Sequence, residues 1–289
     1  MKPVDFDYER PASVAELCRR LAELKGDAKI IAGGQTLVPL LAMRLARPAL
    51  LLDINRIAAL DFIALRDGAL AIGACTRQAA ALAHAPLRAA APLLAKALRF
   101  VGHVQTRNRG TIGGSLANAD PAAEIGLAAL ALDAEARASS VAGERAIAMQ
   151  KFFRGPMETA LAPDECLTEL RVPIWQGAVG TGFHEVSVRH SDFALAAAAV
   201  QVMVEGGRCC RIAISIGGAG ATPLRATEAE ARLLGSALEG RDVDEAGDLA
   251  AKSVTPLADP HASPRYRRRI VAALVKRALT EARDEAKAA

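Results

Sequence analysis

Two short glycine-centred segments are the part of this sequence best suited to bind a ligand. They are Ala32-Gly33-Gly34-Gln35-Thr36 and Thr111-Ile112-Gly113-Gly114-Ser115, and each ends in a hydroxyl residue. Paired glycines can adopt positive φ and let the backbone approach a ligand closely, so that consecutive N–H groups point into one concave pocket. Such a pocket can hold a phosphate, and two of them could hold one diphosphate from both sides.

The better-known phosphate-binding motifs do not fit these segments. A P-loop needs a lysine after its glycines, but Gly34 is followed by Gln35 and Thr36. A dinucleotide-binding fingerprint needs three spaced glycines and an acidic residue about twenty positions later. Asp53 lies at that distance, yet the glycine spacing is wrong. A single glycine–hydroxyl segment is more often a structural turn, so the interpretation depends on the pair and its flanks.

Hydrophobic periodicity predicts the elements that carry the first segment. Ser13 and Glu16 form a capping box ahead of apolar residues at helical spacing. A short strand over residues 28–32 then leads directly into the glycines, and a helix over about 37–45 and a strand over 50–54 follow. The first segment is therefore expected at a strand-to-helix turn.

The second segment is expected in a mixed unit of strands and helices. Asp67-Gly68 predicts a hairpin turn, and Asp120 with Pro121 predicts the start of a helix just after the segment. A stretch rich in Gly and Pro at residues 173–182 predicts a domain boundary. Antiparallel strands are expected at residues 182–188, 193–204 and 208–216, and helices are expected from there to the C-terminus.

Four blocks of the sequence resemble one known family. They are AGGQTLVP at residues 32–39, RGTIGGSLANADPAAE at 109–124, RHSDFA at 189–194 and GGAGATP at 217–223. In this order they resemble the FAD-binding medium subunit of molybdenum-containing hydroxylases, of which the medium chain of aerobic carbon monoxide dehydrogenase is the best-known type. The Thr-Ile-Gly-Gly-Ser block is the most specific of the four.

The resemblance implies an α+β fold with two domains. Residues 1–175 would form an FAD-binding domain of the type found in vanillyl-alcohol oxidase, with subdomains at about 1–55 and 56–175. Residues 178–289 would form a smaller C-terminal domain with a three-stranded antiparallel sheet and helices. FAD would lie between the two subdomains of the first domain.

The resemblance also assigns cofactor contacts, all of them to FAD. Glu124 would accept a hydrogen bond from a cofactor hydroxyl; the alternative is a solvated acid near a helix N-terminus. Phe193 stands where many relatives carry Tyr, and it would either pack near the flavin or be a core aromatic. The implied contact residues are Ala32, Gly33, Gly34, Gln35, Thr36, Thr111, Ile112, Gly113, Gly114, Ser115, Glu124 and Leu167.

The function implied is that of an electron-transfer flavoprotein subunit. A large molybdenum-cofactor subunit would oxidise the substrate, a small subunit with [2Fe–2S] clusters would relay electrons, and this chain would pass them through FAD to quinone, oxygen or NAD. The three chains would assemble as an (αβγ)2 heterohexamer. Two alternatives stay open: a self-contained FAD-dependent oxidase or reductase of the same fold, and an anion-binding module without flavin.

Composition limits the other classes of function. A net charge of +4 with only 3% aromatic residues gives no basis for nucleic-acid binding, and Arg265–Arg269 is typical of a solvated helix face. Five cysteines without a CxxC spacing predict neither a disulfide framework nor a metal site. Because the N-terminus lacks the apolar run of a signal peptide and no stretch predicts a membrane span, we expect a cytoplasmic protein.

Overall fold

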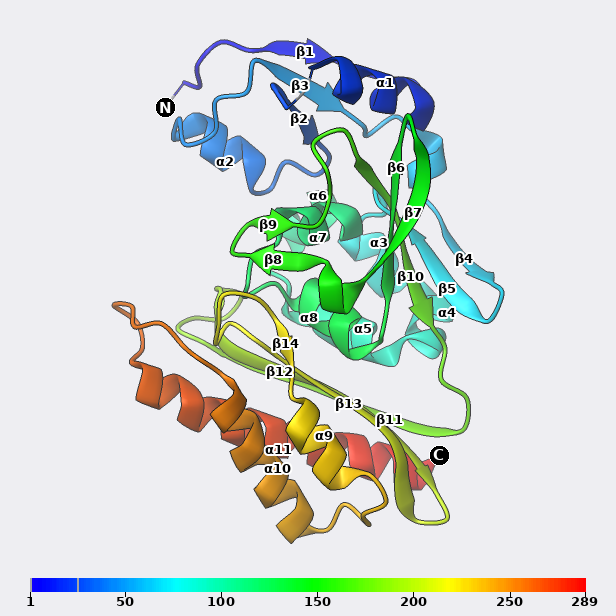
Figure 1. The fold of residues 1–289 in the computed structure, drawn as a ribbon, viewed down its shortest axis with the longest axis vertical. Coiled ribbons are helices and arrows are strands. Elements are labelled where there is room, and N and C mark those ends of the chain that lie inside the picture. The colour runs from blue at the N-terminus through cyan, green and yellow to red at the C-terminus, as the bar shows by residue number, and fades with distance from the viewer. Residues whose placement is uncertain (1, 25) are drawn as a thin grey trace.

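The computed structural model describes residues 2–24 and 26–289. Three units follow one another along the longest axis of an elongated molecule, with the N-terminal unit at one end and the C-terminal unit at the other (Figure 1). The central unit contacts both of the others. The two glycine segments belong to the N-terminal and central units, so the boundary between these units positions the candidate site.

The N-terminal unit is a small parallel sheet with two helices. Ser13 Oγ accepts a hydrogen bond from Glu16 N at 3.2 Å, as the capping-box pattern predicts for a helix start. The sheet has the order β1-β3-β2, and β2 runs directly into the first glycine segment. The elements are β1 (Asp7–Glu9), α1 (Val14–Leu24), β2 (Ala28–Ile31), α2 (Leu37–Ala42) and β3 (Leu50–Asp53).

The central unit is built on a five-stranded antiparallel sheet with the order β4-β5-β10-β6-β7. Its strands are β4 (Ile63–Arg66), β5 (Ala69–Gly73), β6 (Glu135–Ser140), β7 (Gly143–Ala148) and β10 (Cys166–Pro173), and a small hairpin comprises β8 (Phe153–Gly155) and β9 (Glu158–Thr159). The accompanying helices are α3 (Gln78–Ala83), α4 (Ala85–Ala90), α5 (Pro92–Phe100), α6 (Val104–Arg109), α7 (Ile112–Asn118) and α8 (Glu124–Ala131). Short 3-10 turns lie at Ala58–Leu60 and Met149–Lys151.

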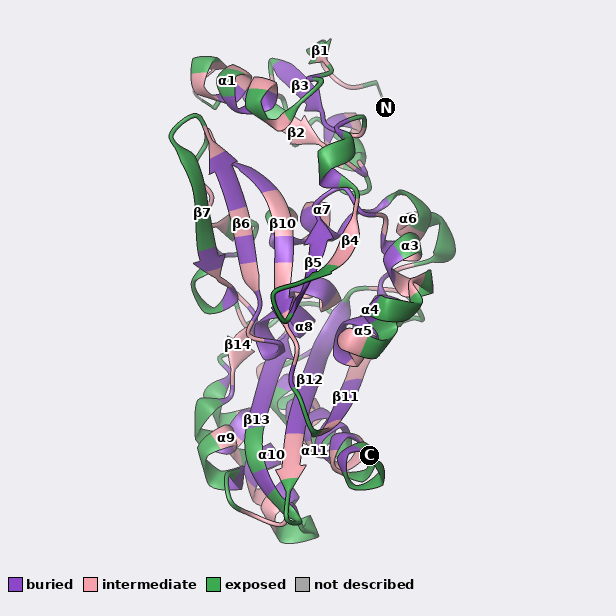
Figure 2. Ribbon diagram, turned by 90° about the vertical axis from the view of Figure 1, so that its right-hand side faces the viewer, coloured by how far each residue is buried: buried purple, intermediate pink, exposed green. Residues whose placement is uncertain are grey.

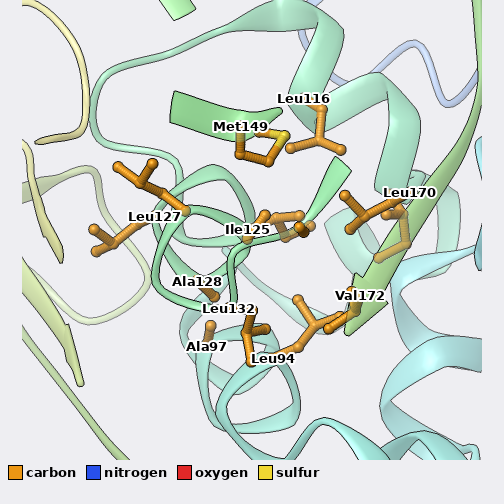
Figure 3. Packing of buried hydrophobic residues seen from close by; sticks show 14 of the residues in the cluster. Leu94, Ala97, Leu116, Ile125, Leu127, Ala128, Leu132, Met149, Leu170 and Val172 are labelled. Carbon is orange, nitrogen blue, oxygen red and sulfur yellow. The ribbon is translucent and has the colours of Figure 1, made fainter. Parts of the chain in front are cut away.

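The core of the central unit holds α7 and α8 in place against the sheet. Figure 3 shows Leu94 of α5, Ile125 of α8 and Val172 of β10 gathered in one cluster with Leu116 of α7. Each of these side chains is fully buried. Because the second glycine segment begins α7, this packing fixes the segment's position.

The C-terminal unit is an antiparallel sheet whose opposite faces pack against helices and against the central unit. The three long strands agree with the sequence prediction, and the sheet also contains a two-residue fourth strand that is too short to be visible in the sequence pattern. Figure 2 shows β12 buried along most of its length, where this sheet meets the central unit. The elements are β11 (Ala178–Ser187), β12 (Ala194–Glu205), β13 (Arg208–Gly217), β14 (Leu224–Arg225), α9 (Thr227–Leu233), α10 (Gly240–Ser253) and α11 (Pro264–Ala288).

The cysteines are unpaired, and the long C-terminal helix is charged. Each of the five cysteines is a free thiol, and Cys210 is the exposed one. Helix α11 carries charged residues along its length, and none of the helices in the described ranges is both long and apolar enough to cross a bilayer.

Candidate functional site at the two glycine segments

The two glycine segments meet in space through Gly33. A Cβ added to Gly33 would lie 2.9 Å from Gly110 Cα and closer still to Arg109 O. Both are backbone atoms of the residues that lead into the second segment. Any larger residue would therefore force the two segments apart, which explains glycine at position 33 by close approach.

A hydrogen-bond network that the sequence analysis missed fixes this contact. The Arg77 guanidinium donates from Nη1 to Arg109 O and from Nη2 to Asn55 Oδ1, the latter at 2.6 Å. Asn55 Nδ2 donates in turn to Ala32 O at 2.8 Å and to Asp53 Oδ1 at 2.6 Å. Arg77 and Asn55 thus connect the lead-in of the second segment with the first residue of the first segment. No short-range spacing reveals such a network.

Asp53 anchors the network from the end of β3. It is only 8% exposed, and although burial acts to raise its pKa, the hydrogen bonds from Tyr8 and Asn55 hold that pKa below its usual value. The carboxylate therefore stays ionised. Its position twenty residues after the glycines serves the network rather than a dinucleotide-binding fingerprint.

The first segment offers free backbone donors. Gly34 has φ +70°, as predicted for a paired glycine. Among the described residues, no acceptor pairs with the main-chain N–H groups of Gly33 to Thr36. Gln35 and Thr36 are exposed, and the Thr36 side chain makes no capping hydrogen bond to α2. This arrangement can bind an anion such as a phosphate.

The second segment has a different geometry from the one that its glycines predict. Thr111 is the N-cap of α7, and its Oγ1 accepts a hydrogen bond from Gly114 N at 3.0 Å. Ile112, Gly113 and Ser115 also donate their amides within the chain, to Thr76 O, Ala74 O and Thr111 O. The prediction of a row of free N–H groups is therefore wrong for this segment. It can offer a ligand its side chains and the surface around its glycines instead.

Close packing, not positive φ, explains the second glycine pair. Neither Gly113 nor Gly114 has positive φ, because both lie in the first turn of α7. A Cβ on Gly113 would lie 2.7 Å from Ala74 Cα, and one on Gly114 would lie 2.7 Å from Thr111 Oγ1. Glycine is required here by the neighbouring chain and by the cap.

Glu124 begins α8, three residues later than the sequence predicts the helix to start. Asp120 forms a turn instead, in which its Oδ1 accepts a hydrogen bond from Ala122 N at 2.9 Å. Glu124 is half-buried, and burial, reinforced by the negative charge of Asp120 and opposed by Arg107, raises its pKa to about 7. Glu124 thus lies at a helix N-terminus and is only partly exposed to solvent.

The remaining candidates lie beside the site and at the start of β12. Leu167 is 5% exposed on β10, and the next residue, Thr168, accepts a hydrogen bond from Ala74 N, next to the second segment. Phe193 is 72% exposed just before β12, so it is not a core aromatic. The structure thus places Leu167 near the second segment and leaves the Phe193 ring open to contact.

Comparisons with known proteins cover nearly the whole chain. The family described as "FAD binding domain in molybdopterin dehydrogenase" matches residues 4–175, and that described as "CO dehydrogenase flavoprotein C-terminal domain" matches residues 181–282. The chain is 41% identical to the 6-hydroxypseudooxynicotine dehydrogenase complex subunit alpha of Paenarthrobacter nicotinovorans, over 99% of this chain and 97% of that protein.

Carbon monoxide dehydrogenases give a similar result. The medium chain from Afipia carboxidovorans is 33% identical over 99% of this chain and all of that protein (100%). A solved carbon monoxide dehydrogenase from Hydrogenophaga pseudoflava, which lacks the Mo-pyranopterin moiety of the molybdenum cofactor, matches with a TM-score of 0.96. It is 35% identical, and the match covers 99% of each chain.

Proposed function

Since the chain belongs to the family of FAD-binding medium subunits of molybdenum-containing dehydrogenases, we propose that it is the electron-transfer subunit of such a complex. FAD is its cofactor, and the chain is an oxidoreductase subunit. Electrons would arrive from the [2Fe–2S] clusters of a small partner subunit and leave through FAD to an external acceptor. Substrate oxidation would take place on a large partner with molybdenum cofactor.

The first glycine segment fits the diphosphate of FAD. The N–H groups of residues 33–36 have no acceptor among the described residues, and the Thr36 hydroxyl lies beside them. Because a diphosphate needs several donors within a small volume, this segment supplies the main anion contacts in the proposal. The contact between Gly33 and the Arg109-Gly110 backbone, which joins the two segments into one site, is the observation that carries the proposal.

The second segment serves the cofactor in another way. Its amides are used inside the chain, so Ser115 Oγ and the glycine surface of α7 are what it can offer to a ligand. Glu124 would accept a hydrogen bond from a cofactor hydroxyl. The proposed contact residues remain Ala32, Gly33, Gly34, Gln35, Thr36, Thr111, Ile112, Gly113, Gly114, Ser115, Glu124 and Leu167.

The chain itself would hold and orient the cofactor. The flavin supplies the one- and two-electron chemistry when it is bound. Arg77 and Asn55 keep the two segments at a fixed separation, so that the cofactor is held across the boundary of two units. A fixed separation favours binding because fewer groups have to be ordered when the ligand arrives.

Assembly and location are also part of the proposal. We propose partnership with a molybdenum large subunit and a [2Fe–2S] small subunit in an (αβγ)2 complex in the cytoplasm, since the relatives are described as a subunit of a dehydrogenase complex and as a medium chain. The electron acceptor would be quinone, oxygen or NAD. The division into residues 1–175 and 178–289, with a subdomain boundary near 55, stays a prediction.

Purification of the chain with and without its partners tests the proposal. The chain alone should bind FAD and oxidise no substrate, whereas the complex with molybdenum and iron–sulfur chains from its own genome should reduce the bound flavin when substrate is added. Failure to take up FAD would contradict the cofactor site. Substrate turnover by the chain alone would favour a self-contained oxidase or reductase.

A further inference from the structure

Arg267 is a buried cation in the first turns of α11, in the C-terminal unit. It is only 6% exposed, and its Nη1 donates hydrogen bonds to Gly218 O at 2.9 Å and to Leu195 O. Its Nη2 donates to the carboxylate of Asp259, in the loop before α11. The planar guanidinium offers donors in several directions, so a single side chain connects β12, the residue after β13 and this loop.

Gly218 carries this anchoring across to the central unit. Its carbonyl accepts from Arg267, and its N–H donates to Pro121 O at 2.8 Å. Gly218 has φ +69°, and a Cβ there would lie 2.7 Å from Ala194 O. Glycine is therefore required at this position, and its conformation is held from both sides.

Pro121 belongs to the turn that leads into Glu124, a proposed FAD contact. Asp120 closes the turn, because its Oδ1 accepts from Ala122 N at 2.9 Å and its main-chain oxygen accepts from Ala123 N at 3.0 Å. Helix α8 begins with the next residue, Glu124. A shift of Pro121 therefore moves the first residue of α8, and the Glu124 carboxyl moves with it.

A cavity makes this turn depend on its hydrogen bond to Gly218. The cavity has a volume of about 240 Å³ and is lined by residues 120–122 of the central unit and by Leu257 and Arg267 of the C-terminal unit. Close packing, which would otherwise fix the turn, is interrupted there. Among the described residues, the bond from Gly218 N to Pro121 O is the hydrogen bond that joins residues 120–123 to the C-terminal unit.

One donor of Arg267 is not used. Its Nε is shielded from solvent and has no hydrogen-bond partner in the part of the chain that the structure describes. A buried donor without an acceptor destabilises the folded state, and a buried charge is itself a costly way to stabilise a fold. These costs favour a role of Arg267 in fixing geometry over a role in stability.

We propose that Arg267 is a positioning residue for the FAD site. Through Gly218 it holds the turn at residues 120–123, and this turn sets the orientation of the Glu124 carboxyl toward the cofactor. The C-terminal unit thereby contributes to FAD binding, and Arg267 acts through Glu124 rather than by contact with the cofactor. This inference rests on the proposed FAD contact of Glu124.

A double-mutant cycle tests whether Arg267 acts through Glu124. Quenching of flavin fluorescence gives the FAD dissociation constant at pH 8, above the pKa of about 7 of Glu124. Glu124→Gln should weaken binding roughly 10- to 100-fold, as expected when a hydrogen bond to a charged group is lost. Arg267→Met should weaken binding by at least about threefold and by no more than Glu124→Gln does.

The double variant decides the question. If Arg267 acts through Glu124, the chain with both substitutions should bind FAD as weakly as Glu124→Gln alone, within about twofold. If the two losses multiply instead, the proposal is overturned. Arg267→Lys keeps the charge but cannot reach all three acceptors, so it should give an intermediate affinity. If Arg267→Met fails to fold, Arg267→Lys takes its place in the same cycle.

Arg225→Met is the matched control. Arg225 of β14 is another mostly buried arginine of the C-terminal unit that reaches the central unit, where it donates to Leu130 O at 3.3 Å and to Asp133 Oδ1 at 2.6 Å. These acceptors lie at the opposite end of α8 from Glu124. Arg225→Met should therefore unfold at a lower urea concentration and keep its FAD affinity. If Arg267→Met behaves in the same way, its role is merely structural and the proposal is overturned.

Hydrogen–deuterium exchange of the apo chain gives a readout that does not need FAD. The amides of residues 122–124 should exchange severalfold faster in Arg267→Met than in the unmodified chain, and Arg225→Met should leave them unchanged. If the unmodified chain fails to bind FAD but this exchange rises, the cofactor proposal fails while the anchoring of the turn stands. If FAD binds to the unmodified chain and to Arg267→Met equally well, the Arg267 proposal fails while the cofactor proposal stands.

Discussion

Gly33→Ala tests the contact that joins the two glycine segments. The added methyl carbon would lie 2.9 Å from Gly110 Cα, whereas ordinary Cβ contacts begin at 3.4 Å, so the segments must separate by at least about half an ångström. The bonds of Arg77 to Arg109 O and Asn55 resist that separation. Overpacking of this kind costs about 1–3 kcal/mol.

The cost can appear in folding, in binding or in both, so both are measured. Urea unfolding of the apo chain gives the free energy of unfolding, and fluorescence titration gives the FAD dissociation constant. If the strain falls on the bound state, a cost of about 1–3 kcal/mol weakens FAD binding by roughly 5- to 150-fold. The two losses together should lie in the stated range of energy.

Gly240→Ala is the matched control. It makes the same chemical change at the start of α10, where an added Cβ meets no heavy atom within 4 Å. That variant should keep its FAD affinity and gain up to about 1 kcal/mol of stability from helix propensity. The reasoning is refuted if Gly33→Ala unfolds at the same urea concentration as the unmodified chain and binds FAD equally well.

Three further predictions concern the Thr111 cap of α7, the Arg77 hydrogen bonds that hold the two glycine segments together, and the buried carboxyl of Glu124. Thr111→Val should lower the free energy of unfolding, measured with urea, by about 1 kcal/mol because α7 loses its N-cap. Thr111→Ser should keep most of that stability because serine retains the capping hydroxyl. Arg77→Met should lower the free energy of unfolding by about 1–3 kcal/mol and weaken FAD binding. Arg77→Lys should restore neither property, since an ammonium lacks the forked donors that reach Arg109 O and Asn55 together. Full recovery in the lysine variant would contradict this role of Arg77. Glu124 has a folded pKa of about 7, above the ordinary 4.5, so its contribution to stability is present below pH 4.5 and is lost as the pH rises to about 7. The free energy of unfolding of Glu124→Gln, relative to that of the unmodified chain, should therefore increase by at most about 3 kcal/mol between pH 5 and pH 8. If urea titrations give the same difference at every pH, the pKa of Glu124 is not raised by burial.

Local signals predicted much of the secondary structure because they depend on neighbours in sequence. The cap at Ser13, whose Oγ accepts a hydrogen bond from Glu16 N at 3.2 Å, follows from short-range hydrogen bonding. The three long strands of the C-terminal sheet follow from alternation and turn residues. The predicted start of α8 was wrong because Asp120 can cap a helix or close a turn with the same local hydrogen bonding, and packing decides between the two.

Neither the exposure of Phe193 nor the backbone conformation of the second glycine pair could be predicted from residue type. Phe193 was as compatible with a core position as with an open one, and the structure leaves it 72% exposed. The second glycine pair looked like a turn with positive φ, but it is helical and packs against Ala74. In both cases the deciding contact, or its absence, involves chain that is distant in sequence.

The sequence by itself determined which residues could cradle a phosphate and, through four ordered blocks, the family and cofactor that they indicate. Only the tertiary structure decided that Gly33 touches the Arg109-Gly110 backbone, and that the first segment keeps its amides free while the second uses them. The physical reason is that donor availability and close approach depend on what the rest of the chain packs against a segment, and no local pattern of residues specifies that neighbour.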